Sequence, residues 1–243
     1  MSVDVERYLE MVSQPWGQMF YHLALAQLSE TTGDALDFGS GLGVMACQLA
    51  RSRKVLAIEP DERMVAHRRR EGEYEQMLGG VERLEQLERQ GRKFGLIVCH
   101  NVLEYVPDRD AVVSRLASLL EDGASLSIVR NHRLGKVMQA AVFAGDPAEA
   151  LRLYRGGAAH TVTMRRSPDE YSGEALLELA RANGLRHVWT RGIRSFYGLG
   201  DNTVKHTEAW QRDMFELERA VQDDPEFRAT AMYHHVLFRK DVS

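Results

Sequence analysis

Features that are scarce in this sequence exclude several classes of protein before any motif is considered. Only two cysteines occur among the 243 residues, and neither has the spacing of a metal ligand. No apolar run approaches the roughly 18 residues of a membrane span. The first residues, Met1–Glu6, have no basic end and no apolar core, so they do not predict a secretory signal. We expect a cytoplasmic protein with reduced Cys47 and Cys99 in its core, no bound metal and no membrane partner.

An excess of positive charge is also missing. The net charge of −4 argues against a protein that coats nucleic acids, although it leaves room for a local basic face. We find no convincing Ser-His-Asp set, paired-acid motif or metal cluster. With 44% hydrophobic residues, the chain can bury one large core, and we expect a single domain over residues 1–243.

The most informative segment that is present is Ala35–Gly43, where an apolar strand leads into three alternating glycines. Asp37 lies near the end of this predicted strand, and a second apolar strand ends at Glu59, before Pro60. Glycines let a ligand lie directly on the backbone, and an acid at the tip of the next strand can hold two ribose hydroxyls. The pattern therefore predicts a cofactor that contains adenosine.

Two cofactor classes compete for this turn. Gly41, Gly43 and Ala46 satisfy the spacing of a dinucleotide site, which would indicate an NAD(P)-dependent oxidoreductase. A pyrophosphate binds at the bare positive end of a helix, however, and the carboxylate of Asp37 would repel it. Asp37 instead suits the sulfonium and ammonium groups of S-adenosylmethionine. A glycine turn without any ligand would require both acids to fall at these positions by chance.

The pattern Asp37-x-Gly39-x-Gly41-x-Gly43, followed by Glu59, resembles motif I and the next acidic position of the class I methyltransferases. The resemblance implies a Rossmann-like α/β fold with a seven-stranded, mostly parallel sheet. Predicted strands and helices alternate along the sequence, as they do in proteins with such a sheet. The predicted strands cover about residues 34–38, 54–58, 74–78, 94–99, 124–129, 185–191 and 231–239.

Two helical additions complete the predicted architecture. A cap helix is expected at about residues 14–30, over the edge of the cofactor cleft. A helical lid is expected at about residues 133–172. Because it follows the fifth strand, this lid should lie at the carboxyl edge of the sheet, where ligands bind.

The resemblance also assigns residues to the cofactor. Asp37 and the turn of Gly39, Ser40, Gly41 and Gly43 would hold its amino-acid part, and Glu59 with Pro60 its ribose. Met64 either lies against the adenine or is a core residue. Val81 and Glu82 follow the third strand, where related enzymes bind the adenine edge. Glu85 competes with Glu82, because the region is too polar to fix the register, and either acid could be a helix-surface residue.

His100 follows the fourth strand at the carboxyl end of the sheet, so it should face the methyl donor. We interpret it as a residue that positions cofactor or substrate, with a structural role and a general base as alternatives. In methyl transfer from a sulfonium the cofactor supplies the reactivity. Oriented proximity then provides much of the catalysis, and a base is needed only where the acceptor must lose a proton.

Several further segments resemble the bacterial tRNA 5-carboxymethoxyuridine methyltransferases. They are His100–Val106, Leu126–Asn131, Arg194–Tyr197, Trp210–Asp213 and Glu216–Glu218. This resemblance implies esterification of a carboxylate on a modified wobble uridine, a group that is already ionised at neutral pH. The sequence departs from that family at Gly17–Phe20, where an arginine is expected, and at Tyr197, where a histidine is expected.

The charge distribution bears on a tRNA partner. Residues 130–194 contain eleven Lys or Arg and six Asp or Glu, and such a basic stretch can meet phosphates, although arginines on helix faces are often merely solvated. The predicted substrate-binding residues are Arg130, Asn131, Arg165, Arg166, Arg194 and Tyr197. The favoured function is methylation of a carboxylate or hydroxyl on a modified tRNA wobble uridine. A small-molecule methyltransferase is the alternative within this chemistry, and an oxidoreductase or a non-catalytic cofactor-binding scaffold would be a different class.

Overall fold

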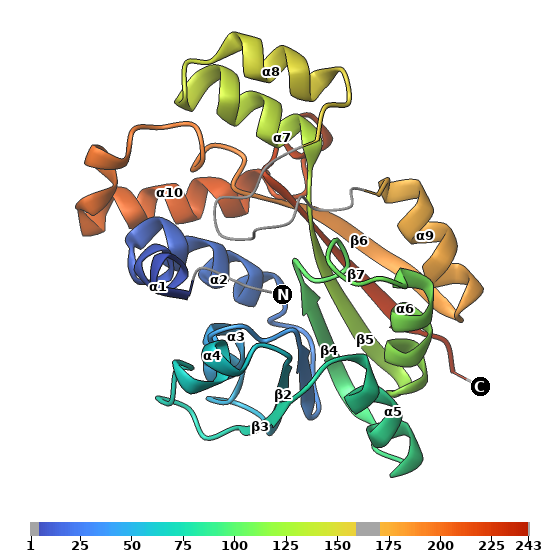
Figure 1. Cartoon of the computed structure of the whole chain (residues 1–243). Helices are drawn as coiled ribbons and strands as arrows, with labels where there is room; N and C mark the ends of the chain where they lie inside the picture. The colour runs from blue at the N-terminus through green and yellow to red at the C-terminus, as the bar shows by residue number, and fades with distance from the viewer. Residues whose placement is uncertain (1–4, 159–170, 243) are drawn as a thin grey trace.

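The computed structural model describes residues 5–158 and 171–242, and its centre is a seven-stranded sheet (Figure 1). The strands are β1 (Ala35–Phe38), β2 (Val55–Glu59), β3 (Glu75–Leu78), β4 (Phe94–His100), β5 (Leu120–Asn131), β6 (Leu185–Ile193) and β7 (Tyr233–Lys240). Their order is β3-β2-β1-β4-β5-β7-β6, with β7 antiparallel to both of its neighbours and the other pairings parallel. This is the predicted Rossmann-like sheet.

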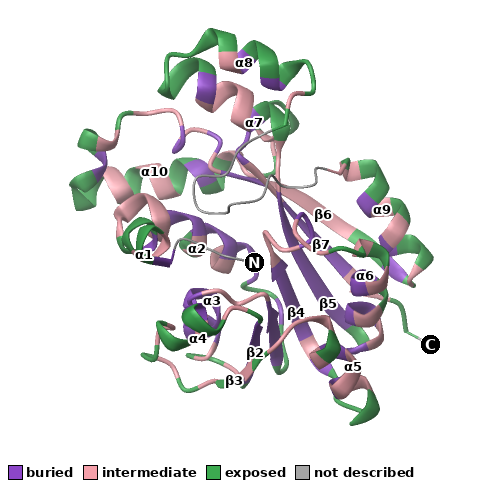
Figure 2. Cartoon of the chain, in the orientation of Figure 1, coloured by how far each residue is buried: buried purple, intermediate pink, exposed green. Residues whose placement is uncertain are grey.

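The helices flank the sheet on both faces. They are α1 (Val5–Ser13), α2 (Pro15–Gln27), α3 (Val44–Leu49), α4 (Glu62–Ala66), α5 (Val81–Arg89), α6 (Arg109–Ser118), α7 (Arg133–Met138), the π-helix η1 (Gln139–Phe143), α8 (Pro147–Tyr154), α9 (Gly173–Ala182), the 3-10 helix η2 (Asn202–His206), α10 (Glu208–Val221) and α11 (Pro225–Arg228). Helices α5, α6 and α9 pack on one face, and α2, α3 and α10 pack on the other. The central strands β1, β2 and β4 are among the most deeply buried parts of the molecule, whereas the edge strand β3 has no buried residue (Figure 2).

One predicted strand and one missed helix needed correction. The fifth strand, predicted at about residues 124–129, begins at Leu120, so Glu121–Gly123 lie inside the strand. Its pairing with β4 shifts between Phe94 and Leu96, and Gly123 has a positive φ angle. The sequence analysis also missed α1, although Val5, Tyr8, Leu9 and Val12 have the spacing of an apolar helix face.

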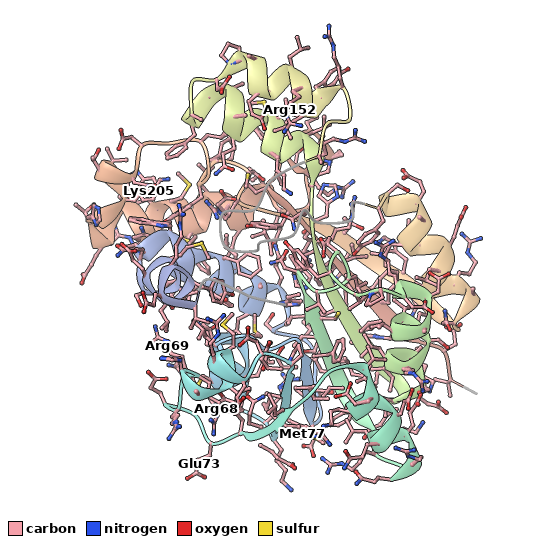
Figure 3. The ribbon with its side chains drawn as sticks, in the orientation of Figure 1. Arg68, Arg69, Glu73, Met77, Arg152 and Lys205 are labelled. Atoms are coloured by element: carbon pink, nitrogen blue, oxygen red, sulfur yellow. The ribbon has the colours of Figure 1, made fainter. Side chains whose placement is uncertain are left out.

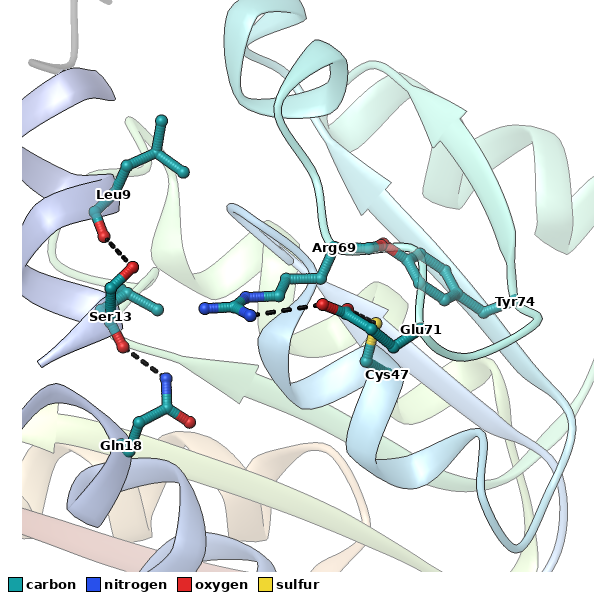
Figure 4. Close-up of polar contacts among 8 residues, drawn as sticks. Leu9, Ser13, Gln18, Cys47, Arg69, Glu71 and Tyr74 are labelled. Atoms are coloured by element: carbon teal, nitrogen blue, oxygen red, sulfur yellow. Dashed lines mark hydrogen bonds and ion pairs between the residues drawn. The ribbon is translucent and has the colours of Figure 1, made fainter. Parts of the chain in front are cut away.

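Helix α1 covers the cofactor turn because a tight joint folds it back on α2. A Cβ atom at Gly17 would collide with the carbonyl oxygen of Met11, so only glycine fits there. The Gln18 side chain donates a hydrogen bond to the carbonyl of Val12, and Ser13 donates to the carbonyl of Leu9 at 2.8 Å (Figure 4). These bonds satisfy carbonyl groups at the end of α1.

The predicted lid is helical over the part that the structure describes. Helices α7, η1 and α8 follow β5 directly and enclose a small core of Ala140, Ala150 and Leu153. The outer surface of α8 is largely exposed (Figure 2). The rest of the predicted lid, with Arg165 and Arg166, lies outside the described residues. In the described ranges, no helix is long and apolar enough to span a membrane.

Candidate functional site

The glycine turn joins β1 to α3 through three left-handed residues. The φ angles of Gly39, Gly41 and Gly43 are 79°, 56° and 68°, a region that side chains disfavour. A Cβ atom would collide with Val102 at Gly39 and with the Tyr74 hydroxyl at Gly43. At Gly41 the nearest atoms, from Tyr8 and Met64, would be 3.7–3.8 Å away. The backbone is therefore most open at Gly41, where a ligand can approach it.

The segment after α4 fixes the start of α3. The Tyr74 hydroxyl that packs on Gly43 donates to the carbonyl of Arg69 at 2.7 Å. Arg69 pairs with Glu71 at 3.3 Å, and Glu71 accepts a weak hydrogen bond from the Cys47 thiol at 3.8 Å (Figure 4). The glycine turn is thus clamped from the side opposite α1. Both Cys47 and Cys99 are free and buried, as predicted.

Two buried carboxylates lie beside the turn. Asp37 is 3% exposed, and burial together with the charge of Glu59 raises its pKa to about 7. Burial also raises the pKa of Glu59. Glu59 accepts hydrogen bonds from the backbone N–H groups of Gly41 at 2.8 Å and Asp61 at 2.9 Å. The structure therefore brings together the two acids that the sequence singled out.

Several buried acceptors at this edge of the sheet have no hydrogen-bond partner. They are the Oδ2 atom of Asp37, the Oγ atom of Ser40, the Nδ1 atom of His100 and the Oδ1 atom of Asn101. Leaving a buried polar atom unpaired costs about 1–3 kcal/mol, so such a set indicates a missing ligand. Acceptors of this kind suit a ligand rich in N–H and O–H donors and carrying positive charge. S-adenosylmethionine fits this site, whereas a pyrophosphate does not.

The tautomer of His100 is set by a hydrogen-bond relay that starts on α2. The Nε2 atom of Gln27 donates to the carbonyl of Gly192 at 3.0 Å, so its Oε1 accepts from Nδ1 of His235 at 2.7 Å. Burial holds the pKa of His235 far below its usual range, and the ring is neutral. Its Nε2 atom must then accept from the Ser127 hydroxyl, 2.6 Å away.

The relay ends at His100. Because the Ser127 proton is used at His235, the Ser127 oxygen accepts from Nε2 of His100, at 2.7 Å. Burial lowers the pKa of His100 to about 3, so this ring is neutral as well. Its Nδ1 atom therefore carries a lone pair and no proton. In this tautomer Nδ1 of His100 can accept a hydrogen bond, and the low basicity of the ring disfavours the general-base alternative.

The remaining residues of the predicted cofactor set lie along the ends of β2 and β3. Met64 is 4% exposed and packs among residues of α1 and α3, with its Cε atom facing Gly41. Val81 and Glu82 begin α5, and Glu82 accepts from the backbone of Gly80 at 2.8 Å. Glu85 instead pairs with Arg115 at 2.7 Å, so Glu82 is the acid at the sheet edge. Pro60 lies within contact of Gly80.

The sequence analysis missed the tyrosines over the turn. The Tyr8 hydroxyl, on α1, lies 2.9 Å from the Tyr21 hydroxyl on α2. Burial raises the pKa of both, and both feel the charge of Asp37. The apolar spacing along α1 could have shown that Tyr8 faces inward, but its neighbours could not be known without the fold.

The predicted substrate residues fall into two groups at the same edge. At the end of β5, Asn131 donates to Oε1 of the buried Glu104 from its backbone at 2.8 Å and its side chain at 3.4 Å. Arg130 is 9% exposed and donates to the carbonyl of Tyr171 at 2.8 Å, while its Nε atom is unpaired. The second group, Arg194 and Tyr197, follows β6. Within the described residues, no cluster of His, Cys, Asp and Glu could hold a metal ion.

Comparisons with known proteins agree with this geometry. Residues 36–126 match the family model of a methyltransferase domain. No curated protein is similar enough in sequence to give a match. Three similar solved structures share 14–16% identity with the chain.

One is an S-adenosylmethionine-dependent methyltransferase from Thermotoga maritima, with 16% identity, 98% of this chain and 96% of that chain covered, and a TM-score of 0.61. Another is the N-methyltransferase NodS from Bradyrhizobium japonicum in complex with S-adenosylhomocysteine, with 14% identity, coverage of 97% and 96%, and a TM-score of 0.58. A third is a Haloferax volcanii protein in complex with the Trm112 methyltransferase activator, with 14% identity, coverage of 99% of both chains, and a TM-score of 0.62. The fold is thus the one predicted from the sequence.

Proposed function

We propose that this chain, an S-adenosylmethionine-dependent methyltransferase by its matched domain and its fold, methylates a carboxylate or hydroxyl on a modified tRNA wobble uridine. The observation that carries the cofactor assignment is the set of unpaired buried acceptors around Asp37 and His100. The acceptor assignment rests on the cations at the ends of β5 and β6.

Different residues of the proposed site would bind different parts of the cofactor. Asp37 and His100 offer acceptors to the ammonium group, and Glu59 offers a carboxylate to ribose hydroxyls once it releases the N–H of Gly41. Met64 and Glu82 border the place where the adenine would lie. When bound, the cofactor supplies an electrophilic methyl group. The protein's task is to hold the acceptor in line with it and to exclude water.

In the described residues, the ends of β5 and β6 present cations at the acceptor end of the site. Arg130 and Asn131 terminate β5, next to His100 at the end of β4. The guanidinium of Arg130 forms no ion pair with a carboxylate in the described parts of the chain. An anionic acceptor would supply that missing charge. Because a carboxylate is already ionised at neutral pH, it needs no proton removed, and this agrees with the neutral, weakly basic His100.

Nucleoside mass spectrometry of tRNA tests this proposal. A strain that lacks the gene should lose a methyl group from a modified wobble uridine. Expression of the wild-type chain should restore the methyl group, and expression of Asp37→Ala should not, because that variant cannot hold the cofactor. Wobble nucleosides that are identical with and without the gene would contradict the tRNA assignment.

A small-molecule acceptor is the second candidate, and one observation favours it. The chain as a whole carries a net charge of −4, which weakens its attraction to a polyanion. Purified enzyme and bulk tRNA separate the two candidates. Methyl transfer from labelled S-adenosylmethionine into tRNA supports the first, and label found only in small metabolites of a cell extract supports the second.

A further inference from the structure

A pair of cations, Arg194 from the predicted substrate-binding set and Lys205, lies at the carboxyl edge of the sheet. Strand β6 ends at Ile193, which pairs with Tyr233 of β7, and Tyr233 pairs in turn with Asn131 of β5. Arg194 is the next residue, so it lies on the same edge as His100. Its φ angle is 63°, a left-handed conformation that is uncommon outside glycine and is often found at functional sites.

The turn that carries Arg194 is held rigid by a buried carboxylate. Glu218 of α10 is 1% exposed and accepts three backbone hydrogen bonds, from Ser195 at 2.8 Å, Phe196 at 2.9 Å and Tyr197 at 2.8 Å. Three of the lone pairs of Glu218 are thus used by this turn, and Glu218 forms no ion pair with Arg194 in the described residues. The Tyr197 ring, fully buried, lies 5.6 Å from the guanidinium of Arg194.

Lys205 supplies the second cation, on η2 (Figure 3). Its side chain is 1% exposed, and its Nζ atom lies 4.9 Å from the centre of the Tyr197 ring and 5.5 Å from that of Phe143, in the lid. Its one hydrogen bond in the described structure goes to Oδ1 of Asn202 at 2.9 Å. An ammonium group has three N–H donors, so two of them are unused.

The charge of Asp201 acts on Lys205, but Asp201 lies beyond ion-pair distance of it. Neither Arg194 nor Lys205 forms an ion pair within residues 5–158 and 171–242, and the Nε atom of Arg194 is buried without a partner. Burial first, and then the nearby charge of Arg194, lowers the pKa of Lys205 to about 8. Buried charges in proteins are normally paired. Arg194 and Lys205 lie around one aromatic ring, and each has N–H groups without a hydrogen-bond acceptor. This pair of cations departs from the usual pairing of buried charges.

We infer that Arg194 and Lys205 form an oxyanion site that binds a phosphate group of the methyl acceptor, with Tyr197 as its floor and Phe143 as its cover. Guanidinium and ammonium groups together match the several oxygens of a phosphate. Glu218 holds the turn that carries Arg194, and Asn202 holds the side chain of Lys205. The entropic cost of ordering these side chains when the anion binds is therefore small.

The place of the site in the sheet explains why it would bind a second group of the acceptor. Strands β4 and β6 are three positions apart in the sheet order, which corresponds to about 14 Å at the usual strand spacing. A group held at Arg194 is therefore remote from the methyl donor, and it anchors the acceptor without receiving the methyl group. That the phosphate belongs to the acceptor rests on the proposed function, whereas the existence of the site does not.

Titration of the lysine itself tests the inference without any acceptor. In protein labelled with ¹³C-lysine, the Lys205 signal is identified by its loss in Lys205→Met. Inorganic phosphate should raise the pKa of Lys205 by about one unit or more, because a bound anion favours the charged form. Acetate should raise it less. An unchanged pKa at saturating phosphate would overturn the inference, and an equal response to acetate would contradict the assignment to phosphate.

Matched variants locate the binding. Phosphate affinity should fall roughly tenfold or more in Arg194→Gln and in Lys205→Met, since each removes a charged hydrogen bond. Arg191→Gln is the control, because Arg191 lies on β6 three residues before Arg194 but is paired with Asp223 at 3.0 Å. Equal losses in all three variants would show that phosphate responds only to net charge. Phosphate binding at these residues in an enzyme that leaves tRNA unmodified would preserve the site and reject the proposed acceptor.

Discussion

At the scale of single residues, the account depends on the protonation of two buried groups. The first is Asp37, whose pKa of about 7 lies far above the value of 3.8 that an exposed aspartate has. A raised pKa in the folded state means that this residue contributes stability below pH 4. That contribution is lost as the pH rises through about 7. The ligand-free protein therefore tolerates a carboxylate that it would fold better without.

Asp37→Asn should accordingly separate stability from binding. At pH 8 we expect the neutral variant to be more stable than the wild type, by roughly 2–4 kcal/mol, and to bind S-adenosylhomocysteine at least tenfold more weakly. Thermal unfolding and calorimetry measure the two effects. Asp34→Asn, an exposed position at the other end of β1, is the control and should change neither quantity. An Asp37→Asn protein that binds as tightly as the wild type would remove Asp37 from the site.

The second group is His100, and its tautomer can be observed directly. With ¹⁵N-labelled histidine, Nδ1 of His100 should show the signal of an unprotonated nitrogen and Nε2 that of an N–H group, from pH 5 to 8. Ser127→Ala removes the acceptor for Nε2 and should mix the two tautomers. A proton on Nδ1 in the wild type, or a charged ring near pH 6, would contradict the relay.

At the scale of elements, the β1–α3 turn separates two contributions to stability. One is the backbone strain of a positive φ angle, and the other is a close contact with a neighbouring side chain. Gly43 and Gly123 have φ angles of 68° and 74°. A Cβ atom at Gly123 would meet nothing within 4 Å, whereas at Gly43 it would collide with Tyr74. The backbone strain is thus similar at both positions, and only the packing differs.

Alanine at each position should reveal that difference. Gly123→Ala should lower the free energy of unfolding by about 1 kcal/mol, from strain alone. Gly43→Ala should cost clearly more and should also weaken S-adenosylhomocysteine binding, because Tyr74 and the start of α3 must move. Denaturant unfolding and calorimetry compare the two variants. Equal losses of stability would show that the clamp by Tyr74 does not matter.

Which elements could be predicted from the sequence depends on how local their signals are. The turn after β1, the acid that ends β2 and the Asp61 cap of α4, which accepts from Arg63 at 2.9 Å, are all encoded by adjacent residues. The relay from Gln27 to His235 joins residues 208 positions apart. Lys205 likewise has no surrounding motif, and its burial becomes visible only when η2, the lid and Tyr197 are placed together.

At the scale of the whole molecule, the sheet order gathers every proposed group at one edge. The parallel strands β1, β2, β4 and β5 end there with Asp37, Glu59, His100 and Asn131 near their tips. Strand β6 brings Arg194 to the same edge because it runs parallel to them across the antiparallel β7. Alternation of strands and helices sufficed to predict this fold. The acceptor could not be predicted in the same way, because its recognition depends on side chains from several distant segments.

The central claim is that the carboxylate beside the glycine turn selects a cationic nucleoside and rejects a diphosphate. Calorimetric titration of the purified chain at pH 8 with S-adenosylhomocysteine, and separately with NAD, tests it most directly. The account predicts micromolar binding of S-adenosylhomocysteine and no detectable binding of NAD. Binding of NAD without binding of S-adenosylhomocysteine would contradict it.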